Sequence, residues 1–232
     1  MPTLRPDRRA IVCLVTDGQR QSAERAGDRT VCDALVELAV AARNAGVDLI
    51  HVRESGLTDR VLVQLVERMV AATHGSDTRV VVNDRVDIAL AAGAAGVHLK
   101  AAAPPAGRVR DVVPPSWIIG RSVHGPDEAR HIEDAGGVDY LVCGTVFETL
   151  SKPTQHPIGI TGLGAVTRAV VLPVLAIGGV HVGNVSSLAA AGAAGIAAIG
   201  LFADLLRSGR SRELSSCVGA LRAAFDKDRG LV

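Results

Sequence analysis

Short apolar runs rich in β-branched residues alternate along the chain with longer segments whose apolar positions recur at helical spacing. Most of the short runs are continuously apolar, which is typical of parallel strands buried on both faces. The predicted strands are Ile11–Thr16, Asp48–Arg53, Arg79–Asn83, Gly96–Leu99, Trp117–Arg121, Tyr140–Cys143, Val174–Ala176 and Ile196–Ile199. The predicted helices include Val31–Ala45, Asp59–Thr73, Gly125–Ala135, Gly162–Val170, Val182–Ala191 and Glu213–Phe225.

Eight strands that alternate with helices in a chain of 232 residues predict an α/β fold, a single (β/α)8 TIM barrel over residues 1–232. A doubly wound open sheet is the main alternative, and it predicts a glycine-rich phosphate turn after the first strand. The segment 15-VTDGQRQ-21 is not such a turn, so the barrel is favoured. We expect residues 1–10 to be flexible and residues 207–232 to supply a C-terminal helix.

Composition narrows the class of protein. The formal net charge of +1 gives no reason to expect nucleic acid or an anionic membrane as partner, so an anionic ligand must be held locally. Four widely spaced cysteines without metal-ligand spacing indicate reduced thiols, and no segment resembles a secretion signal or a membrane span. We therefore expect a cytoplasmic protein. The Ala-rich helix faces leave room for a homodimer.

Glycines at two strand ends give the clearest chemical signal. In TIM barrels, active sites lie at the carboxyl ends of the strands, and the loops after the seventh and eighth strands often bind phosphate through backbone N–H groups. Gly178 and Gly179 follow the seventh predicted strand, and Ile199 and Gly200 end the eighth. Glycine lets the backbone approach a ligand oxygen closely. These four residues predict a phosphate site.

Polar residues at the other strand ends complete the candidate site. His124 follows the fifth predicted strand and directly precedes a helix, whose N-terminus disfavours a positive charge on the ring. A neutral imidazole near pH 7 is what a general base requires, so His124 is the candidate catalytic residue. His98 falls within its strand and is expected to belong to the barrel wall. The candidate substrate-binding residues are His51, Arg53, Asn83, Asp84, Ser122, Thr149, Ser151 and Lys152.

Several segments in the same order resemble the thiamine phosphate synthase/TenI superfamily of phosphate-binding (β/α)8 barrels, over about residues 11–205. The segments are 49-LIHVRES-55, 83-NDRVDIALAAGAAGVHL-99, 119-IGRSVHGPDEA-129, 143-CGTVFETLSK-152 and 174-VLAIGG-179. The resemblance implies an enzyme of thiamine biosynthesis whose substrate is a small phosphorylated heteroaromatic compound.

The synthase branch of this superfamily joins a pyrimidine pyrophosphate to a thiazole phosphate and needs magnesium held by carboxylates. Its Gln-x-Arg-x-Lys motif is matched here at Arg53 only, with His51 and Ser55 at the other two positions. Its acidic turn after the fourth strand reads 100-KAAA-103, which lacks the second carboxylate. Asn83-Asp84 and the loop with Thr149, Ser151 and Lys152 do fit the synthase pattern.

The TenI branch is similar to the chain where the synthase pattern fails, at 50-IHVRE-54 and at Gly120–His124. This resemblance implies a thiazole tautomerase in which His124 transfers the proton, Arg53 orients the substrate carboxylate, and no metal or other cofactor is needed. Two alternatives stay open: a thiamine phosphate synthase that uses Mg²⁺, and a non-catalytic, regulatory barrel that binds thiazole phosphate.

Overall fold

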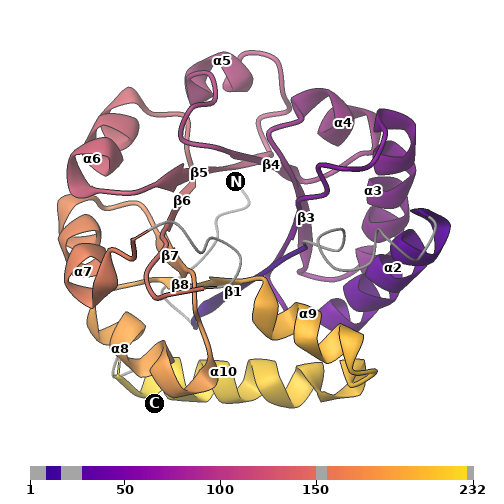
Figure 1. The fold of residues 1–232 in the computed structure, drawn as a ribbon. Coiled ribbons are helices and arrows are strands. Elements are labelled where there is room, and N and C mark those ends of the chain that lie inside the picture. Colours follow the sequence, from indigo (N-terminus) through magenta and orange to yellow (C-terminus); the bar gives the residue numbers. More distant parts are fainter. Residues whose placement is uncertain (1–8, 17–27, 150–155, 229–232) are drawn as a thin grey trace.

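The computed structural model describes residues 9–16, 28–149 and 156–228. Its strands form a closed parallel barrel in chain order, with β1 paired to β8, so the predicted TIM barrel is confirmed (Figure 1). The strands are β1 (Ile11–Val15), β2 (Leu49–Val52), β3 (Arg79–Asn83), β4 (Gly96–Leu99), β5 (Ile118–Val123), β6 (Tyr140–Cys143), β7 (Val174–Ile177) and β8 (Gly195–Ala198).

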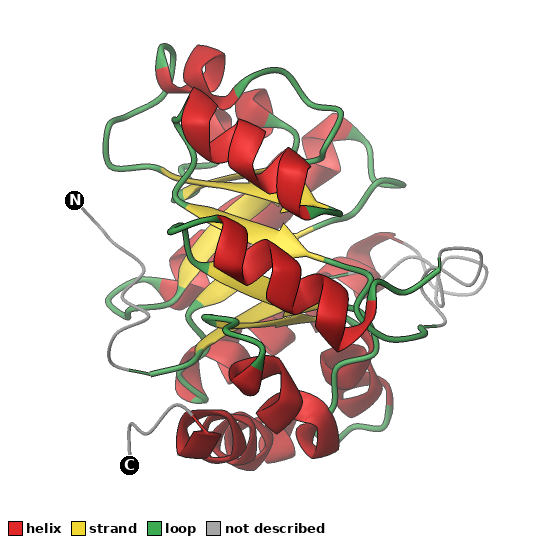
Figure 2. Ribbon diagram, turned by 90° about the vertical axis from the view of Figure 1, so that its left-hand side faces the viewer, coloured by secondary structure: helices red, strands yellow, loops and turns green. Residues whose placement is uncertain are grey.

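Helices surround the barrel, as both the axial and the side view show (Figures 1 and 2). The α-helices are α2 (Asp28–Asn44), α3 (Asp59–Thr73), α4 (Val86–Ala91), α5 (Ala106–Arg110), α6 (Pro126–Ala135), α7 (Gly159–Ala169), α8 (Val185–Ala190), α9 (Gly200–Arg207) and α10 (Leu214–Asp228). Two 3₁₀ turns, η1 (Val182–Asn184) and η2 (Ser211–Glu213), precede α8 and α10. No helix in the described residues is long and apolar enough to cross a membrane.

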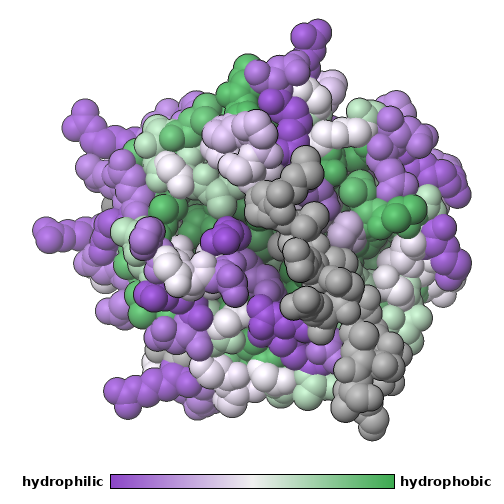
Figure 3. All heavy atoms as spheres, turned by 180° about the vertical axis from the view of Figure 1, so that it is seen from behind, coloured by the Kyte–Doolittle hydropathy of each residue, from purple (hydrophilic) through white to green (hydrophobic). Residues whose placement is uncertain are grey.

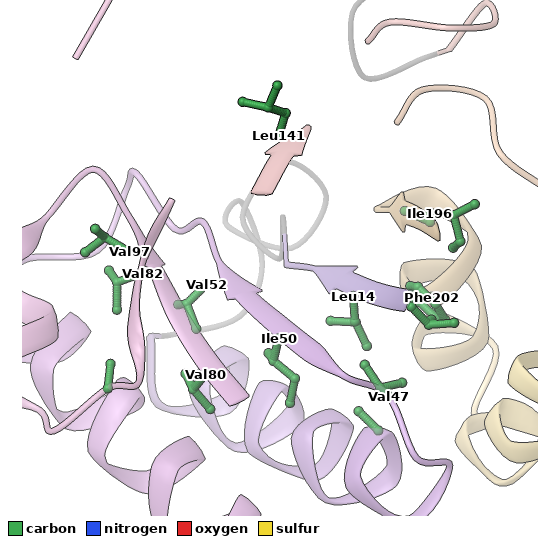
Figure 4. Packing of buried hydrophobic residues seen from close by; sticks show 14 of the residues in the cluster. Leu14, Val47, Ile50, Val52, Val80, Val82, Val97, Leu141, Ile196 and Phe202 are labelled. Atoms are coloured by element: carbon green, nitrogen blue, oxygen red, sulfur yellow. The ribbon is translucent and has the colours of Figure 1, made fainter. Parts of the chain in front are cut away.

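The strands bury side chains on both faces, which explains their continuous apolar runs. Outward-facing residues such as Ile50, Val80 and Val82 pack with the helical layer in one large cluster (Figure 4). Inward-facing residues form a second, smaller cluster inside the barrel, which includes Leu49 and Val81. Because side chains alternate along a strand, His51 and Asn83 continue the inward-facing series toward the carboxyl ends.

The predicted strand limits agree with the structure to within two residues, and Asp59–Thr73 is found unchanged as α3. Three short helices, α4, α5 and α9, have no counterpart among the predicted helices named above. The C-terminal helix α10 begins at Leu214, one residue after the start of the predicted helix Glu213–Phe225, and α9 and η2 precede it within the C-terminal region. Ala10, the last residue of the segment predicted to be flexible, is buried and donates its backbone N–H to Asp226. Residues 1–8 lie outside the described part of the chain.

One cluster of hydrogen bonds joins the C-terminal helix to the amino ends of the first strands. Arg222 of α10 donates to the Gly46 carbonyl at 2.7 Å and to Asp48 Oδ2 at 2.8 Å. Asp48 also accepts from the Val12 N–H at 2.8 Å and from Arg9 at 2.9 Å. We call this the Asp48 cluster. The Asp48 cluster thus attaches α10 to the barrel. α10 also packs against α8 and α2 (Figure 1).

The face of the molecule opposite to that in Figure 1 is hydrophilic over much of its periphery (Figure 3). Val171 in the loop before β7 and Val112 before β5 are exposed apolar side chains, with 95% and 66% of their surface accessible. Isolated exposed apolar residues are normal on protein surfaces. The homodimer therefore stays a prediction.

Candidate active site

The structure places the described candidate residues at or next to the carboxyl ends of the strands, where TIM barrels carry their chemistry. Ser151 and Lys152 lie outside the described residues. The others stand as follows: His51 in β2, Arg53 after it, Asn83 and Asp84 at the end of β3, Ser122 in β5, His124 after it, Thr149 after β6, Gly178 and Gly179 after β7, and Ile199 and Gly200 after β8.

The predicted phosphate residues line one pocket of about 120 Å³. Its wall comes from the loops after β6, β7 and β8, and it ends at the first residue of α9, Gly200. A helix that begins at a pocket presents unpaired N–H groups and a partial positive charge to it, which favours an anion. The lining residues are Thr145, Thr149, Ile177, Gly178, Gly179, Val180, Ala198, Ile199, Gly200 and Leu201.

Glycine is required at the β7 end of this pocket for two reasons. Gly178 and Gly179 have φ angles of +101° and +63°, which disfavour any other residue. A Cβ on Gly179 would also stand 2.6 Å from the Glu148 carbonyl oxygen. Sequence reasoning missed Asn184, which donates to the Gly179 carbonyl at 2.9 Å and accepts from the His181 N–H. Asn184 thereby holds the glycine loop in its curved path.

His124 follows β5 and precedes α6, as predicted, but it has a partner that sequence reasoning missed. The Glu128 carboxylate in the first turn of α6 accepts the His124 backbone N–H at 2.7 Å and lies 3.5 Å from the ring Nδ1. The spacing of four residues was the available signal. A carboxylate beside one ring nitrogen orients the imidazole and leaves Nε2 for proton exchange, as in carboxylate–histidine pairs of hydrolases.

Arg53 is half-buried at the end of β2, and its backbone N–H donates to Thr16 Oγ1 at 3.0 Å. This contact ties the segment after β2 to the end of β1. The next residue, Glu54, is buried although it carries a carboxylate. The chain around Arg53 is therefore held firmly at the rim of the barrel, which suits a residue that orients a charged ligand group.

The contacts of Asp84 bear on whether this site could hold a metal ion. Its Oδ2 forms an ion pair with Lys100 Nζ at 2.7 Å, and its Oδ1 accepts the Lys100 backbone N–H at 2.7 Å. In the described residues, no group of three or more His, Cys, Asp or Glu side chains could hold a metal ion. Magnesium prefers a site with carboxylate and water oxygens, and both oxygens of Asp84 already bind Lys100. As placed here, Asp84 is paired with Lys100 and belongs to no metal-binding group of described side chains.

Arg121 stabilises the turn after β4, which carries no acidic residue in this chain. Its buried guanidinium donates three hydrogen bonds of 2.7 Å, to the carbonyl oxygens of Ala101, Ala103 and Pro104. The turn that carries acidic residues in the synthase pattern is thus built here from alanine and proline around an arginine.

Inside the barrel lie two chains of polar groups. In the first, which we call the Tyr140 chain, Tyr140 OH lies 3.3 Å from His98 Nδ1, and His98 Nε2 lies 2.9 Å from Ser122 Oγ. In the second, His51 Nε2 lies 3.2 Å from Asn83 Oδ1, and the Asn83 amide donates to Asp84. The two imidazole rings are in contact, with their centroids 4.6 Å apart.

Burial sets the ionisation of these groups. Loss of solvation lowers the pKa of His51 to about 4 and that of His98 well below its usual value, so both imidazoles are neutral at pH 7. Burial also raises the pKa of the Tyr140 phenol, which stays protonated. The sequence analysis did not name His98 or Tyr140 as functional candidates, because a histidine or tyrosine within an apolar strand is expected to pack in the barrel wall.

Comparison with known proteins agrees with this geometry. The chain matches the thiamine monophosphate synthase (TMP-TENI) family over residues 13–202. It is 38% identical over 195 residues to the thiamine-phosphate synthase of Roseiflexus castenholzii, a match that covers 84% of this chain and 81% of that protein. It is 40% identical over 201 residues to the thiamine-phosphate synthase of Albidiferax ferrireducens, covering 85% and 84% of the two chains.

Solved structures give the same picture. Thiamine phosphate pyrophosphorylase from Pyrococcus furiosus superposes with a TM-score of 0.75 at 28% identity, over 95% of this chain and 98% of that one. A 3-hexulose-6-phosphate synthase superposes with a TM-score of 0.63 at 18% identity, which shows the shared fold alone. From the family match, the relatives and the barrel together, the chain belongs to the thiamine monophosphate synthase/TenI family of thiamine biosynthesis enzymes.

Proposed function

We propose that the protein is a thiazole tautomerase, which converts a non-aromatic thiazole phosphate carboxylate into its aromatic tautomer. The observation that carries this choice within the family is the Asp84–Lys100 pair, in which a lysine occupies both oxygens of the carboxylate that a synthase would offer to magnesium. A tautomerase needs no departing pyrophosphate and hence no such metal. It needs an anchored phosphate and one group that moves a proton.

The proposed binding mode follows from the strand ends. The substrate phosphate would lie in the pocket of Gly178, Gly179 and Gly200, where backbone N–H groups and the start of α9 favour an anion. Arg53 would hold the substrate carboxylate by a charge-assisted hydrogen bond. Anchoring both charged ends places the ring between them, over the open end of the barrel.

In the proposed mechanism, His124 carries the proton transfer. Its Nε2 takes a proton from one position of the non-aromatic ring and returns one at another, so no net proton is gained or lost. Glu128, 3.5 Å from Nδ1, stabilises the imidazolium that forms in between. Aromatisation of the ring makes the reaction favourable without a cofactor.

Thiamine phosphate synthase is the second candidate, because the relatives at 38% and 40% identity carry that name. Asn83 and Asp84 at the end of β3 also fit its pattern. In this case Mg²⁺ would have to displace Lys100 from Asp84, and the reaction would release pyrophosphate.

The deciding experiment offers the purified protein both reactions in parallel. One arm supplies the non-aromatic thiazole phosphate carboxylate and follows aromatisation by absorbance. The other supplies hydroxymethylpyrimidine pyrophosphate, thiazole phosphate and Mg²⁺, and follows pyrophosphate release. We expect aromatisation only, and His124→Ala should reduce its rate by roughly 10²–10⁴-fold, the usual contribution of general acid–base catalysis.

The control variant is His131→Ala, since His131 is an exposed histidine on α6 that lies away from the strand ends. It should retain the full rate. Pyrophosphate release in the second arm would establish the synthase instead. Binding of thiazole phosphate without turnover in either arm would indicate a regulatory barrel, and would refute both enzymatic functions.

A further inference from the structure

The Tyr140 chain is an unusual filling for a TIM barrel, whose interior is normally packed with branched aliphatic side chains. Tyr140 is fully buried and His98 is 98% buried, whereas Ser122 is half-buried and so lies at the open end of the chain. Buried polar groups destabilise a fold unless they are hydrogen-bonded, and here each one is. The arrangement therefore has a direction, from a closed end at Tyr140 to an open end at Ser122.

The direction of the hydrogen bonds follows from counting donors. Among the described residues, Tyr140 OH has a single hydrogen-bond partner, His98 Nδ1 at 3.3 Å. If Tyr140 donates, His98 carries its proton on Nε2 and donates to Ser122 Oγ at 2.9 Å. Within the described part of the chain, the Ser122 O–H then has no acceptor, so it can point toward the open end of the barrel. In the opposite direction the buried Tyr140 O–H would lack an acceptor, which is unfavourable.

We propose that Tyr140 and His98 are positioning residues that fix the Ser122 hydroxyl as a hydrogen-bond donor toward the open end of the barrel. The ligand group it selects is an acceptor on the ring end of the substrate, a carboxylate oxygen or an unprotonated ring nitrogen. The identity of this ligand rests on the proposed function, whereas the direction of the hydrogen bonds in the Tyr140 chain does not.

The residues around the Tyr140 chain hold its side chains in one arrangement. A Cβ on Gly120 would stand 2.1 Å from Tyr140 Cζ, so the glycine on β5 makes room for the phenol. The His51 ring lies against the His98 ring on its other side, at 4.6 Å between centroids. Ser122 faces the same side of β5 as Gly120, because side chains alternate along a strand.

The chain can orient a ligand but is a poor source of protons. If Ser122 gave its proton to the substrate and His98 replaced it, the proton would finally have to come from Tyr140. Burial raises the pKa of this phenol, and a tyrosinate inside the barrel is therefore disfavoured. Proton transfer stays with His124, and the Tyr140 chain contributes to recognition. A donor fixed in this way also discriminates against ligands that lack an acceptor at that position.

The first test reads the tautomer of His98 directly in the full-length protein without ligand, by two-bond ¹H–¹⁵N correlation on ¹⁵N-histidine-labelled samples. His98→Gln assigns the signal. We expect the Nε2–H tautomer in the wild type, and Tyr140→Phe, which removes the donor to Nδ1, should raise the share of the Nδ1–H tautomer to give a mixture. A wild-type Nδ1–H tautomer, or a His98 signal unchanged in Tyr140→Phe, would overturn the proposal. The wild-type spectrum decides even if Tyr140→Phe fails to fold.

The second test measures affinity by calorimetry with two probes, the aromatic thiazole phosphate carboxylate and inorganic phosphate. Ser122→Ala should weaken the first by roughly 10–100-fold, the usual effect of losing a hydrogen bond to a charged group, and leave the second unchanged. Ser122→Thr restores the hydroxyl and should recover most of the affinity. Equal weakening of both probes would overturn the proposal. A correct His98 tautomer in a protein that releases pyrophosphate would refute the tautomerase and leave the positioning role standing.

Discussion

Removal of Arg222 should destabilise the barrel strongly without changing its chemistry. In Arg222→Ala, Asp48 loses an ion pair of 2.8 Å in which both side chains are largely buried, with 15% and 16% of their surface exposed. The carbonyl of Gly46 loses a donor at 2.7 Å, and that of Ala10 loses one at 3.3 Å. The variant thus disrupts the Asp48 cluster and the anchoring of α10 at one point.

The magnitude follows from these contacts. Breaking a buried ion pair costs about 3–5 kcal/mol because a charge is left uncompensated. Here Arg9 and the Val12 N–H still bind Asp48, so we expect the low end, about 3 kcal/mol. For a domain of this size 1 kcal/mol corresponds to roughly 2–4 °C in Tm, so the midpoint should fall by about 6–12 °C.

The assay is thermal unfolding followed by circular dichroism, with urea unfolding as a second measure. The matched control is Arg68→Ala, which breaks an ion pair with Asp33 at 2.6 Å whose side chains are 46% and 51% exposed. Exposed pairs contribute about 0–1 kcal/mol, so its Tm should change by less than about 4 °C. The kcat/KM of both variants should equal that of the wild type at 25 °C. If Arg222→Ala is no less stable than Arg68→Ala, the Asp48 cluster does not anchor α10 as argued.

Two further predictions concern the site. The free energy of unfolding should fall as pH drops from about 6.5 to about 4, because unfolded His51 and His98 bind protons in this range that the folded protein excludes. The share of His51 should be on the order of 3 kcal/mol and should be lost in His51→Gln, as urea unfolding across pH can measure. Asn184→Ala frees the Gly179 carbonyl and should weaken phosphate binding about tenfold with little change in Tm, as calorimetry and thermal unfolding can check; unchanged affinity would mean that the glycine loop holds its shape alone.

The barrel could be predicted because its signal repeats along the chain. Each strand is an apolar run buried on both faces, so eight such runs between helices fix the order and approximate limits of the strands. The short helices α4 and α9 were missed for a physical reason. α4 has six residues and α9 has eight, which give only two turns each, too few for a helical period to stand out.

The candidate site was predictable residue by residue where it depends on strand ends, and not where it depends on contacts between strands. The glycines of β7 and β8 line one pocket because parallel strands end at one edge. The Asp84–Lys100 pair joins residues 16 positions apart, at the ends of neighbouring strands β3 and β4. Asp84 is a candidate from the sequence alone, whereas Lys100 alone resembles an ordinary polar loop residue, and only the structure shows that the two are paired.

Membership of the family leaves open which of the two reactions the protein catalyses. Barrel and phosphate pocket are common needs of a synthase and a tautomerase, so an identity near 40% can arise from them whichever reaction occurs at the ring. The two reactions differ in the charge that must be stabilised. A departing pyrophosphate requires cations, Mg²⁺ among them, whereas a tautomerisation moves one proton and requires an oriented base. In this chain Asp84 is neutralised by Lys100, and His124 is oriented by Glu128. This difference in charge is the ground on which we propose the tautomerase, on a barrel that the synthases share.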